Sequence, residues 1–252
     1  MRKMTLYAQH TNKLFWSRYL YKFTVRLPQI SFLRYGKNKV FESLFKCETY
    51  EQWQSVQLKD VYRYRYMLNP DAAGKERLEL WNKRFQLFKF VNFINKHKIN
   101  GVDLRVRYES DTASVCTNNK DLFDEGVALL TGDVIELVWP KSDKHSEFLV
   151  NNPHYEIVEK YPYNKFMYKV ELKGYQRIDR AIIHNIDQWF KNYSSLQITK
   201  DALEQLKEGF MANGKFIYST NEKDMLLLQM LLGNLIKRIV TYKLESEIEN
   251  AN

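Results

Sequence analysis

Two seven-residue segments of this chain match each other, and each lies in the same local context. Cys116–Leu122 reads CTNNKDL and Ser219–Met225 reads STNEKDM, so four of the seven positions are identical. Each segment follows a short run typical of a strand and precedes an apolar run with the length of a helix. Since a match this short also arises by chance, its weight comes from the order of the elements around it.

A second pair of similar stretches lies upstream in the same order. YLYKFTVR (19–26) and FMYKVELK (166–173) both place Tyr-Lys at their third and fourth positions. Each half of the chain then reads β-α-β-β-α-β, although one strand of the second half is not clear from its pattern. We therefore predict an α+β protein built from two tandem ferredoxin-like domains that arose by internal duplication. The predicted domains span 1–140 and 155–252, and the polar stretch 141–154 is the expected linker.

The first predicted domain carries a long insertion that contains the clearest helix of the chain. Its apolar residues recur at spacings of three and four, namely at Leu78, Trp81, Phe85, Phe88, Val91 and Ile94. This periodicity is typical of an amphipathic helix whose stripe is buried in a core. Gly101 stands where a helix C-terminal cap is expected. We expect the stripe, including Trp81, Phe85 and Phe88, to be largely buried.

The Thr-Asn pairs of the two matched segments precede predicted helices. Thr117 or Asn118, and Thr220 or Asn221, are residue types that cap a helix N-terminus by accepting backbone N–H hydrogen bonds. A helix N-terminus also favours a bound phosphate, which is the alternative interpretation of these pairs. Capping is the simpler explanation, because it requires no ligand.

Charge is unevenly distributed along the chain. The whole sequence carries 39 Lys and Arg against 30 Asp and Glu, a net charge of +9. Residues 1–110 hold 22 cationic against 9 acidic side chains, and residues 111–252 hold 17 against 21. A basic half favours a polyanionic partner such as a nucleic acid. A solvated basic surface, or attraction between the two halves, would also explain the imbalance.

Three basic stretches predict where a nucleic acid would bind. YRYRY (62–66) alternates Tyr and Arg, so that a strand would present the aromatic rings on one face and the guanidinium groups on the other. LRVRYE (104–109) repeats the alternation, and FLRYGKNK (32–39) adds cations at a predicted turn. Arginines on a strand bind phosphates, and aromatic rings stack on bases. The candidate nucleic-acid-binding residues are Arg34, Lys37, Lys39, Arg63, Tyr64, Arg65, Arg105 and Arg107.

Signals for catalysis are weak throughout the sequence. No two histidines have a metal-ligand spacing, and no glycine-rich phosphate loop or Gly-x-Ser-x-Gly motif occurs. Glu171 and Lys173 have the acid-x-Lys form of many nucleases, and Arg177 and His184 have the spacing of some helical ribonucleases. Duplicated ferredoxin-like proteins of this length also include CRISPR RNA-processing endonucleases, whose glycine-rich loop is reduced here to LLGNL. We expect no catalytic residues, no cofactor and no metal.

The sequence therefore predicts a non-enzymatic protein that binds RNA or single-stranded DNA, with a composition that suits a phage or viral accessory protein. The main alternative is a protein–protein interaction module with a structural or regulatory viral role. The second alternative is an endoribonuclease of the duplicated ferredoxin-like type. Two distant cysteines, no secretory signal and no apolar run long enough to span a bilayer favour a cytoplasmic setting without membrane contact. The oligomeric state stays open.

Overall fold

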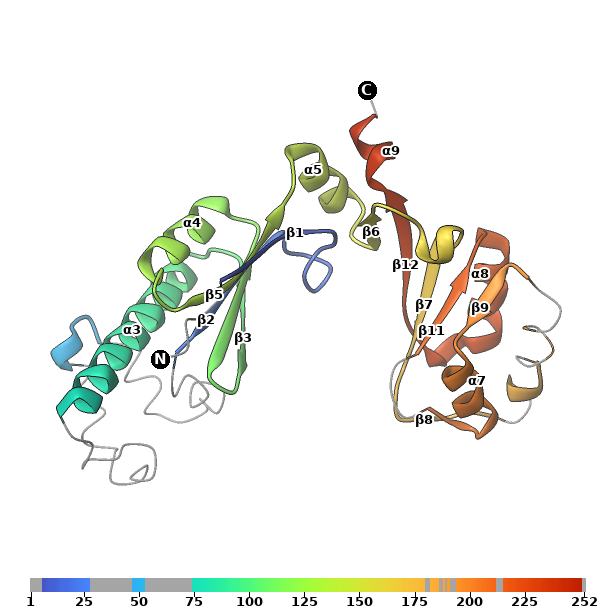
Figure 1. Cartoon of the computed structure of the whole chain (residues 1–252), viewed down its shortest axis with the longest axis horizontal. Helices are drawn as coiled ribbons and strands as arrows, with labels where there is room; N and C mark the ends of the chain where they lie inside the picture. The colour runs from blue at the N-terminus through green and yellow to red at the C-terminus, as the bar shows by residue number, and fades with distance from the viewer. Residues whose placement is uncertain are drawn as a thin grey trace. The chain divides into compact units, whose positions relative to one another are not determined.

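The chain forms two compact units in a computed structural model that describes residues 6–27, 47–52, 74–179, 182–185, 188, 190, 194–211 and 215–250. One unit comprises Met1–Thr11 and Arg18–Lys141, and the other comprises Asn12–Ser17 and Ser142–Asn252. Both units combine a mixed β-sheet with helices (Figure 1), so the predicted α+β class is confirmed. Within the described ranges, no helix is long and apolar enough to cross a membrane.

The first unit alternates strands and helices along the chain. Its described elements are β1 (Tyr7–Thr11), β2 (Tyr21–Arg26), α3 (Gly74–Ile99), β3 (Leu104–Glu109), β4 (Thr112–Thr117), α4 (Lys120–Leu129) and β5 (Val134–Pro140). The strands form one sheet in the order β1-β5-β2-β4-β3. Neighbours are antiparallel except β1, which lies parallel to β5 at the edge. The stretch YLYKFTVR (19–26) contains β2 and the alternating stretch LRVRYE (104–109) forms β3, whereas β1 was not predicted.

The core of the first unit lies between the sheet and the helices α3 and α4, which cover one face of the sheet (Figure 1). Phe23 and Val25 of β2 are fully buried there against apolar residues of α3 such as Phe90 and Phe93. Successive residues of a strand point to opposite faces, so the residues between these apolar positions face away from the helices. This alternation is what creates a separate polar face on the sheet.

Helix α3 confirms the predicted helix and its C-terminal glycine, with one correction. Gly101 has a φ of +70°, and its N–H donates to the Lys98 carbonyl while the Val102 N–H donates to the His97 carbonyl. These two bonds form a Schellman motif, which ends the helix. The expected burial of Phe88 is confirmed, but Phe85 is 38% exposed, so its burial was wrongly predicted. The reason is that the buried stripe runs through Phe90 and Phe93 as well and is rotated away from Phe85.

The second unit contains a larger number of short elements. Those that the structure describes are α5 (Asp143–Asn151), β6 (Tyr155–Val158), η3 (Pro162–Asn164), β7 (Tyr168–Leu172), β8 (Gln176–Arg177), β9 (Leu196–Ile198), α7 (Lys200–Lys207), β10 (Phe210–Met211), β11 (Phe216–Ser219), α8 (Glu222–Leu232), η4 (Gly233–Leu235), β12 (Ile236–Leu244) and α9 (Glu245–Glu249). Residues 141–154, predicted as a linker, instead contain α5. Ser142 caps this helix by accepting the His145 N–H, and His145 and Leu149 are buried.

The main sheet of the second unit has the strand order β6-β12-β7-β11-β9. Its neighbours are antiparallel except β6, which lies parallel to β12 at the edge. Strand β9, with only three residues, is the strand that the sequence pattern left unclear. Helices α7 and α8 pack on one face and bury a core that includes Val170, Ile217 and Leu228. β8 and β10 form a separate two-stranded ribbon.

Strand register gives a different alignment of the two sheets from the seven-residue sequence match. The two alignments differ by one residue. Tyr21 of β2 pairs with Thr117 of β4, and Tyr168 of β7 pairs with Ser219 of β11. Thr117 therefore takes the place of Ser219 in its sheet, whereas the sequence match puts Cys116 opposite Ser219. The upstream match of Tyr21 with Tyr168 agrees with the register.

The helix caps follow the structural correspondence. Asn119 caps α4 by accepting the Leu122 N–H, and Asn221 caps α8 by accepting the Asp224 N–H. The expected cap at Asn221 is confirmed. The expected cap at Thr117 or Asn118 was two residues or one residue early, because Thr117 ends the strand β4 and Asn119 is the cap. The side chain of Asn118 instead accepts the Leu20 N–H.

Candidate nucleic-acid interface

The face of the first sheet that points away from α3 and α4 carries most of its polar side chains. We call it the polar face and define it by Lys22, Thr24, Arg26, Arg105, Arg107, Ser114, Cys116 and Glu136. Cross-strand register brings these residues together, because Arg105 pairs with Cys116, which pairs with Lys22. In the next row, Arg107 pairs with Ser114, which pairs with Thr24. Three neighbouring strands thus contribute to one surface.

Arg105 and Arg107 alternate with apolar residues of β3 that contact the core. Leu104, Val106 and Tyr108 pack against the core cluster, whereas the two arginines are exposed. The predicted separation of the arginines from the apolar side chains of this strand is therefore confirmed. Both side chains lie on the surface of the sheet, where they are accessible to an anion.

The cations of the polar face are partly balanced by carboxylates. Lys22 Nζ lies 2.7 Å from Glu136 Oε2, and the Thr24 hydroxyl donates to the same oxygen at 2.8 Å. Arg26 Nε lies 3.3 Å from Asp111, and Arg107 forms an ion pair with Glu109. Most of these groups are exposed, so these pairs hold the side chains weakly. An arriving phosphate therefore competes with carboxylates for the same cations.

Cys116 lies in the centre of the polar face but does not supply a nucleophile. The residue is completely buried, and this burial raises the pKa of its thiol to about 12. The thiol is therefore protonated at neutral pH, whereas nucleophilic attack requires the thiolate. Cys116 is a free cysteine. The row formed by Arg105, Cys116 and Lys22 is thus suited to binding and not to covalent chemistry.

The structure describes Arg105 and Arg107 but not the other predicted site residues. Arg34, Lys37, Lys39, Arg63, Tyr64 and Arg65 lie outside the described residues. Lys22 and Arg26 were not predicted, although β2 has the same signal as β3: cations alternate with apolar residues along YKFTVR. Their position on the same face as the arginines of β3 follows from the strand register, with β4 between the two strands.

The corresponding face of the second sheet is organised differently. Arg238 Nε and Nη2 donate to the two carboxylate oxygens of Glu171 at 2.7 and 2.8 Å. Lys169 Nζ lies 3.5 Å from Glu156 and 3.6 Å from Glu171, and Lys13 donates to Glu156 at 3.1 Å. We call Glu156, Lys169, Glu171 and Arg238 the ionic cluster. Its members other than Arg238 are buried, so these charges stabilise the unit internally and are poorly placed for a ligand.

The predicted nuclease-like pairs gain little from this arrangement. The Glu171 carboxylate is already bound by Arg238 and surrounded by lysines, which lowers its pKa and compensates its charge. Arg177 lies in β8, where it pairs with Phe210, and His184 is exposed. Glu171 is thus explained as a structural carboxylate.

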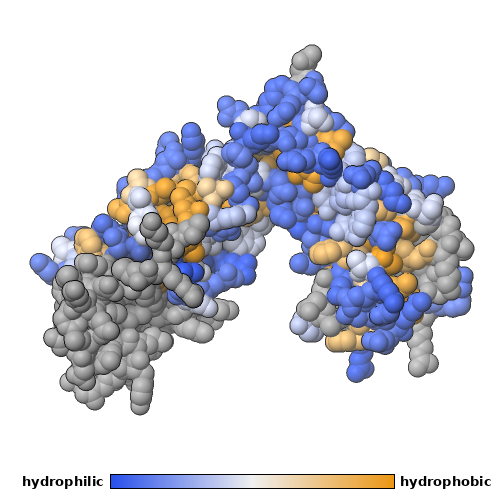
Figure 2. Space-filling view, in the orientation of Figure 1, coloured by the Kyte–Doolittle hydropathy of each residue, from blue (hydrophilic) through white to orange (hydrophobic). Residues whose placement is uncertain are grey.

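Comparison of the chain with protein-family models, with curated proteins and with solved structures gave no significant match. Figure 2 shows that hydrophilic residues predominate on the visible described surface, with apolar patches among the helices.

Proposed function

We propose that the chain binds single-stranded nucleic acid, RNA or DNA, through the polar face of the first sheet, without catalysing a reaction. The observation that carries the proposal is the presence of four cations on the sheet face opposite α3 and α4, with Lys22 and Arg26 on β2, Arg105 and Arg107 on β3, and β4 between these strands. Alternate residues of a strand are about 7 Å apart, which lets successive side chains reach separate phosphates of an extended strand. Binding through phosphates would carry little sequence preference.

The contrast between the two sheets supports assigning the binding surface to the first unit. In the second unit the equivalent face holds the buried ionic cluster, in which cations and carboxylates compensate one another. In the first unit Arg105 and Arg107 are exposed. The excess of cationic residues in 1–110 points to the same unit. The basic stretches around Arg34 and Arg63, which lie outside the described residues, are proposed to bind the nucleic acid as well.

We also propose that the two units are ferredoxin-like domains related by duplication. Four antiparallel strands have the same spatial order in both units. The order is β5-β2-β4-β3 in the first unit and β12-β7-β11-β9 in the second, which in both cases is fourth, first, third and second along the chain. Each sheet also carries an extra edge strand parallel to the last one, β1 in the first unit and β6 in the second. A shared, unusual addition supports common descent better than the seven-residue match does.

The proposal is tested by fluorescence anisotropy with labelled single-stranded RNA and DNA over a range of salt concentrations. Each phosphate contact contributes about 0.7 to the slope of log K against log salt for single strands. Substitution of Arg105→Ala together with Arg107→Ala should weaken binding and reduce this slope by about 1.4. The matched control is Lys98→Ala with Lys120→Ala, which removes two exposed cations from helices of the same unit.

The expected result is a large loss of affinity in the arginine variant and a small one in the lysine control. Equal losses would mean that binding follows net charge and not the polar face. Absence of binding at low salt, where electrostatic attraction is strongest, would reject nucleic-acid binding and favour a protein interface at this surface.

A further inference from the structure

The imidazole of His145 is buried without a hydrogen-bond partner for its Nε2 atom. His145 lies in α5, is only 2% exposed, and Nε2 makes no hydrogen bond within the described part of the chain. Glu245 Oε1 lies 3.8 Å from this nitrogen, which is too far for a hydrogen bond. Buried polar atoms in native proteins are nearly always paired, so an unpaired one requires an explanation.

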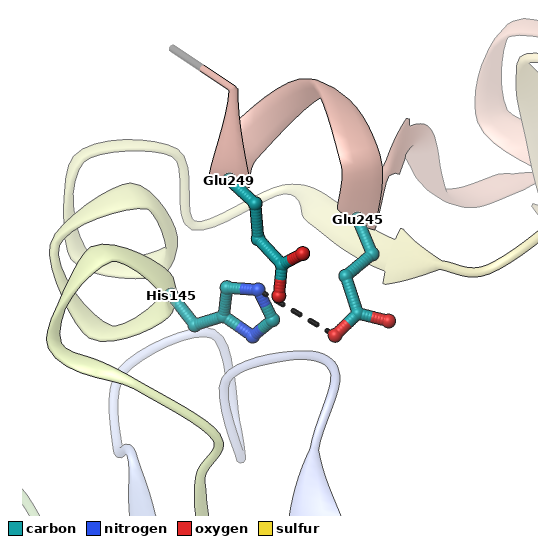
Figure 3. A group of neighbouring side chains, drawn as sticks. All are labelled: His145, Glu245 and Glu249. Carbon is teal, nitrogen blue, oxygen red and sulfur yellow. Dashed lines mark ion pairs between the residues drawn. The ribbon is translucent and has the colours of Figure 1, made fainter. Parts of the chain in front are cut away.

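Two carboxylates of α9 converge on this nitrogen. Glu245 and Glu249 are four residues apart, so both project from the same side of the helix. Figure 3 shows their carboxylates facing the His145 ring from α9, with the ring projecting from α5. One ligand atom from each residue lies within 4.8 Å of one from each of the others. All three residues belong to the second unit.

We propose that His145, Glu245 and Glu249 bind a divalent transition-metal ion of the zinc class, and that the ion fastens α9 to α5. An imidazole nitrogen with two carboxylate oxygens is a donor set suited to Zn²⁺, while Mg²⁺ and Ca²⁺ prefer oxygen ligands alone. The two carboxylates together carry the charge that matches a divalent cation. The orphaned Nε2 would gain its missing partner.

The geometry requires only a small adjustment. Zinc–ligand distances of about 2.0–2.2 Å place tetrahedral ligand atoms about 3.4 Å from one another. The three atoms would therefore have to approach by about 1 Å or somewhat more. Glu249 is exposed and Glu245 half-buried, so their side chains have room to move, whereas His145 is fixed in the interior. Three protein ligands leave a fourth position for water.

The consequence for the fold concerns the short helix α9. A helix of five residues is too short to be stable by itself. Ile248, which is buried, gives it one apolar anchor. A metal ion that bridges one turn of α9 to α5 would add a second anchor on the adjoining side of the helix.

The test is titration of the untagged, full-length chain with Zn²⁺ against a chromogenic chelator, with Co²⁺ absorption as a report of coordination. One equivalent should bind, and Glu249→Gln and Glu245→Gln should each weaken binding at least about tenfold, because even residues that only support ligands affect affinity by that factor. The matched control is Glu147→Gln, an exposed carboxylate of α5 outside the cluster. Mg²⁺ and Ca²⁺ should compete poorly. Amide exchange of 245–250 should slow when Zn²⁺ binds.

Two results would overturn the proposal. The first is no equivalent of Zn²⁺ bound by the intact chain. The second is an equal affinity for Zn²⁺ in the Glu249→Gln variant and in the Glu147→Gln control. The metal would then be bound at other histidines. Glu249 is exposed, so its replacement leaves the core unchanged. The Zn²⁺ affinity of the Glu249→Gln variant therefore tests the proposal even if a variant at His145 fails to fold.

Discussion

Arg238 on β12 and Glu171 on β7 are direct cross-strand partners joined by two hydrogen bonds, from Nε at 2.7 Å and from Nη2 at 2.8 Å. Such a two-point contact is among the stronger interactions available to a guanidinium group. Glu171 is buried on the face of the sheet opposite the core. The pair therefore links β12 and β7 at a buried site, where water cannot fully replace the hydrogen bonds that Arg238 donates.

Substitution of Arg238→Met should destabilise the second unit by about 2 kcal/mol, because Glu171 would keep a buried charge without its main donor. The loss stays below that of a fully buried pair, since Arg238 is partly exposed and Lys169 remains 3.6 Å from Glu171. Urea unfolding measures the change. Lys237→Met is the control, since its Nζ is 3.8 Å away and mostly exposed. A loss as large for Lys237 as for Arg238 would contradict a specific role of the two-point contact.

The stability of the second unit should depend on pH through Glu171. Hydrogen bonding from Arg238 outweighs burial and holds the pKa of this carboxyl below its ordinary value. The unfolded chain takes up the proton near pH 4.3, and the folded chain only at lower pH. The stabilisation is therefore complete above about pH 4.3 and is lost as pH falls through the folded pKa.

The measurement is the difference in free energy of unfolding between the wild-type chain and Glu171→Gln across this range. The difference should be largest near neutral pH and should shrink in acid. In an Arg238→Met background the pH dependence should be reduced, because the main cause of the lowered pKa is gone. A difference that is constant with pH would show that the ion pair does not govern it.

Gly126→Ala should destabilise the first unit although alanine is the better helix former. A Cβ atom at this position would lie 2.5 Å from Phe23 Cζ and 2.9 Å from Phe93 Cζ, both within the core. Overpacking of this kind costs about 1–3 kcal/mol, which exceeds the gain of up to about 1 kcal/mol in helix propensity. Gly132→Ala, where nothing lies within 4 Å of the added atom, is the control and should be close to neutral in thermal unfolding. A stable Gly126→Ala variant would mean that the two phenylalanines move easily.

The two asparagine caps should respond differently to the same substitution. Alanine at Asn119 or Asn221 should cost about 1 kcal/mol, because each side chain accepts a backbone N–H of its helix. Asn119→Asp should keep the acceptor and the stability. Asn221→Asp should not, since its Nδ2 donates to Asp224 at 2.8 Å and a carboxylate there would repel it. Equal behaviour of the two Asp variants in urea unfolding would count against this assignment.

Glu109→Gln should strengthen the proposed nucleic-acid binding. Glu109 forms an ion pair with Arg107, and both side chains are exposed. Removal of the carboxylate charge frees Arg107 for a phosphate and also removes repulsion of the polyanion. The same anisotropy assay should show tighter binding at low salt and little change at high salt. Weaker binding by this variant would mean that Glu109 positions Arg107 for the nucleic acid.

The elements that the sequence predicted well are those with a strong local period. β3 alternates cations with apolar residues, so its pattern predicts both the strand and its buried side. α3 repeats apolar residues at helical spacing, which predicts the helix but places the exposed Phe85 in the core. β1 was missed because YAQHT is polar, with only Thr11 buried. α5 was missed because its surroundings are polar and include Asn-Asn-Pro, although Ser142 caps it.

The candidate sites were predictable only as far as they are local. Arg105 and Arg107 lie on one strand, so alternation alone separates them from the core. The contribution of Lys22 depends on cross-strand register, which a single sequence does not specify. The approach of His145 to Glu245 depends on the packing of two helices that are far apart in the chain. No spacing within one segment could have indicated it.

The assignment of Asn12–Ser17 to the second unit has a consequence for the order in which the chain acquires its structure. The Asn12 carbonyl accepts the Ile157 N–H, Lys13 pairs with Glu156, and Leu14 is buried. These six residues leave the ribosome before the second unit exists, so they must wait until residues beyond 157 have been synthesised. The second unit expressed from Ser142 onward would lack this early segment, leaving Glu156 without one of its cations. The two units are therefore separate folds, but the second unit is not one continuous segment of the chain, and its first segment is synthesised long before the rest.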